Sequence, residues 1–152
     1  MNRLFHPYYF ESVDSKDQAD FAQFFLKSYS TKILMNILKL LEQYRNGVYV
    51  SPRVLQQCII YVEYSVVPEF TWKFLKQHML TILQEILYPL MCHTDEDDDL
   101  FENDPVEYIK TKYSEWEIEL SLMEAARDLV ERVANKRQQM LEQAMLFCMQ
   151  VF

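Results

Sequence analysis

The most concentrated group of ionisable side chains in this sequence is a run of carboxylates. These side chains share one short stretch and account for most of the net charge of -8. Carboxylates packed so closely raise the local negative potential, which attracts basic partners in a salt-dependent way. The same composition is also typical of a solvated loop whose charges repel one another. Both interpretations stay open, and the candidate partner-binding residues are Asp95, Glu96, Asp97, Asp98, Asp99 and Glu102.

Alternating aspartates at positions 95, 97 and 99 also resemble the start of a calcium-binding EF-hand loop. Such a loop needs glycine at its sixth position for a sharp turn and glutamate at its twelfth for bidentate ligation. Leu100 and Val106 occupy those two positions. The sequence therefore predicts no calcium site here.

No other group of reactive side chains gathers in the sequence. The three histidines stand apart, and the three cysteines lack the spacing of a zinc site or a disulfide framework. Nucleophile elbows and phosphate-binding loops need glycine where the backbone turns sharply, and Gly47 is the single glycine. The negative net charge argues against a nucleic-acid-binding surface. We therefore expect a chain that is not an enzyme, holds no metal or cofactor, and contacts no nucleic acid directly.

The cysteines and the hydropathy also indicate the cellular compartment of the chain. An odd number of widely spaced cysteines suits a reducing compartment. No stretch is apolar enough, over enough residues, to span a bilayer. The sequence thus indicates a soluble intracellular protein with no membrane partner.

Apolar residues recur at three- and four-residue spacing through most of the chain, which predicts amphipathic helices. Ser51 and Pro52 mark one helix start, where the serine oxygen is expected to cap free N–H groups. Pro68 ends that helix. Residues 1–16 are predicted to be an irregular lead-in, and residues 93–104 an acidic loop. Helices are expected at 17–46, 52–67, 69–90, 105–113, 122–133 and 140–151.

These helices predict an all-α fold. Helix pairs with short loops and a unit of roughly 40–47 residues fit a HEAT-type α-solenoid. Residues 17–152 would then hold about three antiparallel helix pairs of an α-α superhelix. A compact helical bundle is the structural alternative. Because the last helix stays apolar to its end, whereas terminal repeats carry a polar outer face, we expect a piece of a longer array.

Four stretches resemble the importin-β superfamily of nuclear transport receptors, in its importin seven and importin eight subgroup. They are residues 21–29, 40–62, 71–79 and 86–113, and the last is the most specific. It reads PLMC, then the acidic run, then DPVEYI. The residues of this last motif are interpreted as structural, forming a helix start, complementing the helix dipole and packing on a neighbouring helix, with direct partner contact as the alternative. These residues are Asp104, Pro105, Glu107 and Tyr108.

The resemblance implies a HEAT-repeat receptor that carries cargo proteins, basic ones among them, between cytoplasm and nucleus. It further implies control by the small GTPase Ran, bound through the full-length receptor rather than this segment, and nuclear pore proteins as further partners. Two alternatives stay open. One is a HEAT or armadillo scaffold without a transport role, or a truncated paralogue acting only as an interaction module. The other is the helical accessory domain of an enzyme.

Overall fold

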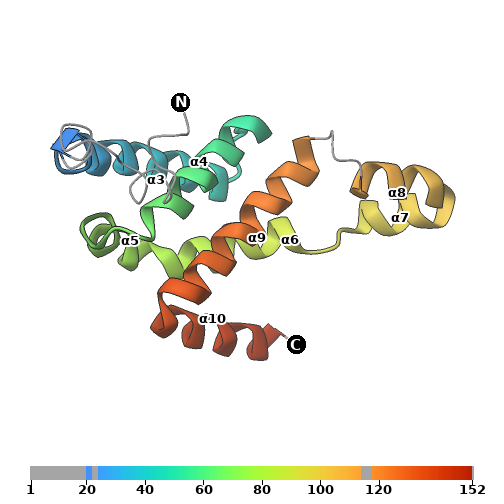
Figure 1. The fold of residues 1–152 in the computed structure, drawn as a ribbon. Coiled ribbons are helices and arrows are strands. Elements are labelled where there is room, and N and C mark those ends of the chain that lie inside the picture. The colour runs from blue at the N-terminus through green and yellow to red at the C-terminus, as the bar shows by residue number, and fades with distance from the viewer. Residues whose placement is uncertain (1–19, 22–23, 114–117, 152) are drawn as a thin grey trace.

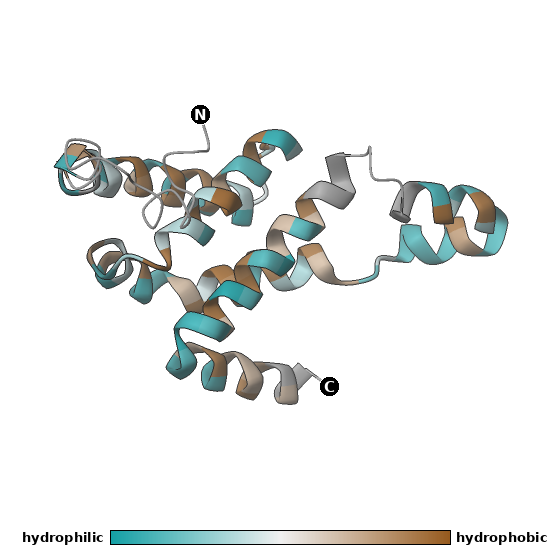
Figure 2. Cartoon of the chain, viewed as in Figure 1, coloured by the Kyte–Doolittle hydropathy of each residue, from teal (hydrophilic) through white to brown (hydrophobic). Residues whose placement is uncertain are grey.

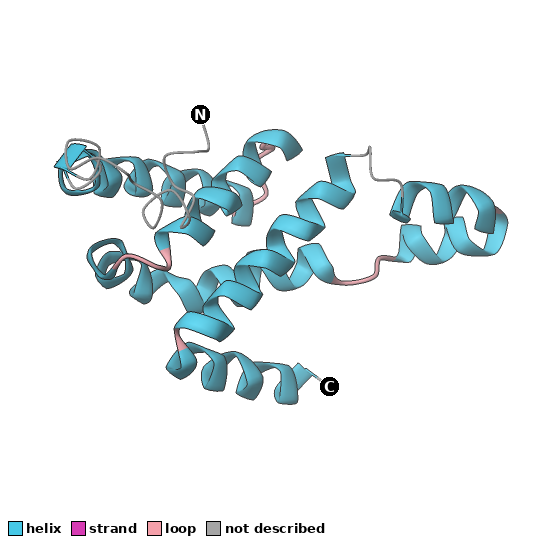
Figure 3. Ribbon diagram, viewed as in Figure 1, coloured by secondary structure: helices cyan, strands magenta, loops and turns pink. Residues whose placement is uncertain are grey.

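The computed structural model describes residues 20–21, 24–113 and 118–151 (Figure 1). The predicted irregular lead-in at 1–16 lies outside these residues. Within the described ranges the secondary structure is helical, with short connecting loops and no strand (Figure 3). None of the helices in these ranges combines the length and the apolar character needed to cross a membrane. The predicted all-α fold is confirmed.

The first helix pair is formed by α3 (Thr31–Arg45) and α4 (Pro52–Ser65). A π-helical turn, Leu26–Ser30, leads into α3. The chain leaves α3 at Gly47, whose φ of +79° is open to glycine without strain. Pro52 opens α4 as predicted, but the predicted serine cap is wrong, because the Ser51 side chain makes no capping hydrogen bond. The backbone carbonyl of Ser51 instead accepts the first helical bond, from the N–H of Leu55 at 2.9 Å.

The predicted helix at 69–90 is one continuous helical stretch. It comprises α5 (Glu69–Ile82), a π-helical turn at Leu83–Leu87 and α6 (Tyr88–Met91). The buried Thr71 hydroxyl donates to the carbonyl oxygens of Ser65 (2.7 Å) and Pro68 (3.0 Å). These bonds hold the short turn between α4 and α5 in one conformation.

The predicted acidic loop at 93–104 is wrong, because most of it is helical. Residues Asp95–Asn103 form α7, and Pro105–Tyr113 form α8. The two helices pack against each other as a hairpin that extends away from the other helices in Figure 1. Beyond it lie α9 (Ile118–Lys136) and α10 (Gln138–Val151).

The helices pack in two layers. In one layer α4 lies against α9, and in the other α5 contacts both α3 and α10. Helix α9 also packs on α6 and on the π-helical turn before it, so α5–α6 and α9 form a second pair. The α7–α8 hairpin is an insertion between the two members of that pair. The described residues thus hold two stacked helix pairs plus α10, a packing consistent with a HEAT-repeat segment.

The core runs continuously through both layers, as expected of stacked repeats rather than separate units. Each fully buried Leu, Ile or Met contributes about 1.5–3 kcal/mol through burial. Small residues on α9, Ala125 and Ala126, allow α4 to approach closely. Figure 2 shows hydrophobic bands on the helix faces, with α7 largely hydrophilic. The core includes Leu34, Leu41, Leu55, Ile59, Val62, Leu75, Met79, Leu87, Leu129 and Val133.

Candidate partner-binding site

Helix α7 begins with a capping box. Thr94 Oγ1 accepts from the N–H of Asp97 (3.3 Å), and Asp97 Oδ2 accepts from the N–H of Thr94 (3.0 Å). All four residues of the first turn, Asp95 to Asp98, are acidic, and their charges complement the positive end of the helix dipole. The acidic composition that predicted a loop therefore stabilises a helix N-terminus.

Asp97 differs from the other candidate residues because its side chain is part of the capping box. Its side chain is largely buried, and His93 Nδ1 lies 3.6 Å from Asp97 Oδ2. Asp98 is exposed but bonds to His93 Nε2 at 2.9 Å. The remaining candidates are exposed and form no ion pair with a described residue, so they are the ones available to a partner. These are Asp95, Glu96, Asp99 and Glu102.

The motif residues after α7 shape the second helix of the hairpin. Asp104 Oδ1 accepts from the N–H of Glu107 at 3.0 Å, and Pro105 occupies the first helical position. Glu107 pairs with Lys110 at 3.3 Å. The Tyr108 ring meets the Phe101 ring edge-on at a centroid distance of 5.3 Å, which fastens α8 to α7.

The hairpin also exposes apolar side chains beside its carboxylates. Phe101, Val106 and Ile109 are each more than half exposed. Isolated exposed apolar residues are ordinary on protein surfaces. Their position next to four unpaired carboxylates nevertheless gives a partner both apolar and charged groups to contact.

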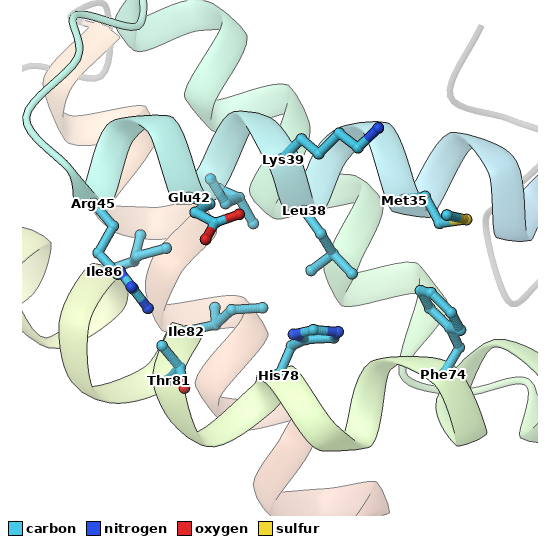
Figure 4. Close-up of a pocket in the computed structure, with 11 residues that line it drawn as sticks. Met35, Leu38, Lys39, Glu42, Arg45, Phe74, His78, Thr81, Ile82 and Ile86 are labelled. Atoms are coloured by element: carbon cyan, nitrogen blue, oxygen red, sulfur yellow. The ribbon is translucent and has the colours of Figure 1, made fainter.

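A separate hollow of about 280 Å³ lies between α3 and α5 (Figure 4). Leu38, Ile82 and Ile86 give it an apolar floor, and charged residues of α3 lie along its edge. Arg45, on that edge, is engaged with Glu85 at 3.3 Å. None of the residues that line it is a nucleophile hydrogen-bonded to a base.

Reactive side chains elsewhere in the described residues do not converge. Burial raises the pKa of the Cys58 thiol, which favours the unreactive neutral form. No three histidine, cysteine, aspartate or glutamate side chains in the described ranges come together as a metal-binding group. What the structure offers is a packed array with charged and apolar surfaces.

Sequence comparison identifies the proteins to which this helical-repeat chain is similar. The chain is 41% identical over 151 residues to importin-8 from Danio rerio. It is 40% identical over 149 residues to importin-8 from Homo sapiens, and 35% identical over 137 residues to an importin beta-like SAD2 homolog from Arabidopsis thaliana. These alignments cover 99%, 98% and 90% of the chain, but only 15%, 14% and 13% of the relatives.

Stacked helix pairs define the chain as a helical-repeat protein. Its similarity over nearly the whole sequence shows that it is homologous to a segment of the importin-8 and importin-7-like receptors of the importin-β family. The chain spans about 15% of the length of the importin-8 relatives. No family model matches the chain. No solved structure matches it either.

Proposed function

We propose that this chain is a non-enzymatic, protein-binding segment of an importin-β-type nuclear import receptor. Homology to importin-8 over nearly the whole chain supports the transport role. The single observation that supports a place for cargo is the α7–α8 hairpin, which presents unpaired carboxylates on a projecting element. The cargo would be basic proteins, and the receptor would work in both cytoplasm and nucleus.

The mechanism needs no chemistry beyond contact. Exposed carboxylates steer a basic partner to the hairpin and lose influence as salt screens them. In a repeat array small rotations between neighbours add up to a large change in curvature. Ran bound elsewhere in a full-length receptor could thereby alter cargo affinity here, since two sites coupled through one array influence each other reciprocally. Nuclear pore proteins are further proposed partners of the receptor.

The test neutralises the hairpin while keeping its fold. The triple variant Glu96→Gln, Asp99→Asn and Glu102→Gln removes three exposed charges and leaves the capping box intact. Its affinity for a lysine-rich peptide is measured at low and at physiological salt. Exposed ion pairs contribute about 0.2–1 kcal/mol each, so we expect affinity at low salt to fall roughly tenfold.

A matched control separates a local effect from net charge. Glu42→Gln, Glu124→Gln and Glu142→Gln remove the same charge from α3, α9 and α10, where all three residues are exposed. The control should bind the peptide with nearly unchanged affinity. Unchanged affinity of the hairpin variant at low salt, or an equal loss in the control, would count against a partner site on the hairpin.

A further inference from the structure

Thr94 carries an exposed hydroxyl group directly before the acidic run. It lies in the connection between α6 and α7. Its backbone is extended, with a φ of -111° and a ψ of 159°, and Cys92 at the start of the same connection is extended as well. Each of the five residues that follow Thr94 carries a carboxylate: Asp95, Glu96, Asp97, Asp98 and Asp99.

Among the serine and threonine side chains that the structure describes, Thr94 alone combines exposure with carboxylates on its C-terminal side. Ser51 is also exposed, but Pro52 and Arg53 follow it. Thr94 is therefore the described hydroxyl with the most distinctive chemical surroundings. The remaining hydroxyl residues with described side chains are buried or half-buried: Ser28, Ser30, Thr31, Ser65, Thr71 and Thr81.

The segment around Thr94 can adopt the extended form in which a protein kinase binds its substrate. Helix α7 has nine residues, fewer than the roughly 12–15 that an isolated helix needs to be stable in water. It packs mainly on α8, and Asp97 is the buried residue of its first turn. The bond that Thr94 Oγ1 accepts from the N–H of Asp97 is long, at 3.3 Å. Unwinding this turn therefore breaks few contacts.

We infer that Thr94 is phosphorylated by an acidophilic protein kinase, whose substrate groove is lined with lysine and arginine. The carboxylates after Thr94 pair with those cations, and the same charges repel kinases with acidic grooves. A bond forms between Thr94 Oγ1 and the γ-phosphorus of ATP, while the bond from that phosphorus to the bridging oxygen breaks and ADP leaves. The catalytic aspartate of the kinase accepts the hydroxyl proton. The assignment holds whether or not the hairpin binds a basic cargo.

The phosphate changes the start of α7 in two ways. It adds about 1.5–2 negative charges to the hairpin at neutral pH. It also lies beside the carboxylate of Asp97, whose Oδ2 accepts from the N–H of Thr94 at 3.0 Å, and like charges so close repel each other. Phosphorylation therefore strengthens the negative potential of the hairpin and weakens its capping box.

The experiment incubates the purified chain with ATP and an acidophilic kinase of the casein kinase type. Tandem mass spectrometry follows the peptide that contains Thr94. We expect phosphate on Thr94, and none on this peptide in Thr94→Val. The triple variant Glu96→Gln, Asp97→Asn and Asp98→Asn keeps an oxygen able to cap Thr94 but removes three charges. Its initial rate should fall roughly tenfold, because three charge contacts with the kinase are lost.

A matched control removes the same charge from other helices. The variant Glu42→Gln, Glu124→Gln and Glu142→Gln should be phosphorylated on Thr94 at the rate of the unaltered chain, and a kinase with an acidic substrate groove should leave Thr94 unmodified. Absence of phosphate on Thr94, or an unchanged rate in the triple variant, would overturn the assignment. An equal fall in the control would overturn it too, since net charge rather than the sequence after Thr94 would then set the rate.

Discussion

At the scale of single residues, two arginines join parts of the chain that are distant in sequence. Arg132 reaches Glu63 from 69 positions away, and Arg137 reaches the turn between α4 and α5 from 71 positions away. Arg137 donates to the carbonyl oxygens of Val66 (2.9 Å) and Val67 (3.1 Å), and its Cζ lies 4.7 Å from the Trp72 ring centroid. One side chain thereby fixes the α9–α10 turn to the α4–α5 turn.

Replacing Arg137 with lysine tests this role. A lysine keeps the charge but cannot span two carbonyls and stack on an indole at once. We expect Arg137→Lys to lower the free energy of unfolding by about 2 kcal/mol, measured with urea and followed by tryptophan fluorescence. Arg127→Lys, on the exposed side of α9, is the control and should change the free energy little. Equal stability of the two variants would show that the Arg137 contacts contribute nothing.

At the scale of elements, a helix could be predicted from sequence wherever the spacing of apolar residues was helical and a proline marked the helix start. The helices at 52–67 and 69–90 were predictable because buried residues recur at helical spacing and prolines mark both starts. The second helix of the hairpin, α8, was also predictable, at 105–113. Its first helix, α7, was not, because Leu100 and Phe101 are the only apolar residues of α7. A local signal existed in Thr94 and Asp97, whose spacing is that of a capping box.

The candidate site was predictable only in part. Sequence located the carboxylates, but it could not separate the largely buried Asp97 from its exposed neighbours. It also gave no sign of the hollow between α4 and α9, which depends on residues 64 or more positions apart meeting across two helices. Such contacts follow from how the helices stack, and apolar spacing along one helix does not report that.

The capping box makes a prediction about α7 as an element. Asp97→Ala removes the reciprocal bond to Thr94 and the contact with His93, whereas Asp95→Ala removes only a first-turn charge. Loss of a cap costs about 1 kcal/mol, so amide hydrogen exchange at residues 96–103 should quicken roughly fivefold in Asp97→Ala. The change should stay local, because α7 packs mainly on α8. Similar exchange rates in the two variants would contradict a capping role for Asp97.

At the scale of the whole molecule, the exposed apolar surface of α10 decides how the chain behaves in solution. Met145, Leu146 and Met149 are 57%, 60% and 76% exposed on this one helix. The opposite side of α10 contacts α5 and α9. A cluster of large apolar side chains left in water favours association, since burying each of them releases free energy.

We therefore expect the chain to self-associate as its concentration rises, with sedimentation velocity reporting the change. The double variant Met145→Gln and Met149→Gln should shift the transition to at least several-fold higher concentration, because it replaces exposed methionines that association would bury with hydrated amides. Met35→Gln, a similarly exposed methionine on α3, is the control and should leave association unchanged. If the unaltered chain stays monomeric at high concentration, the α10 surface is too small to drive association. If it associates but the double variant does so equally, another surface drives contact, and the acidic hairpin with Phe101, Val106 and Ile109 is the next to alter.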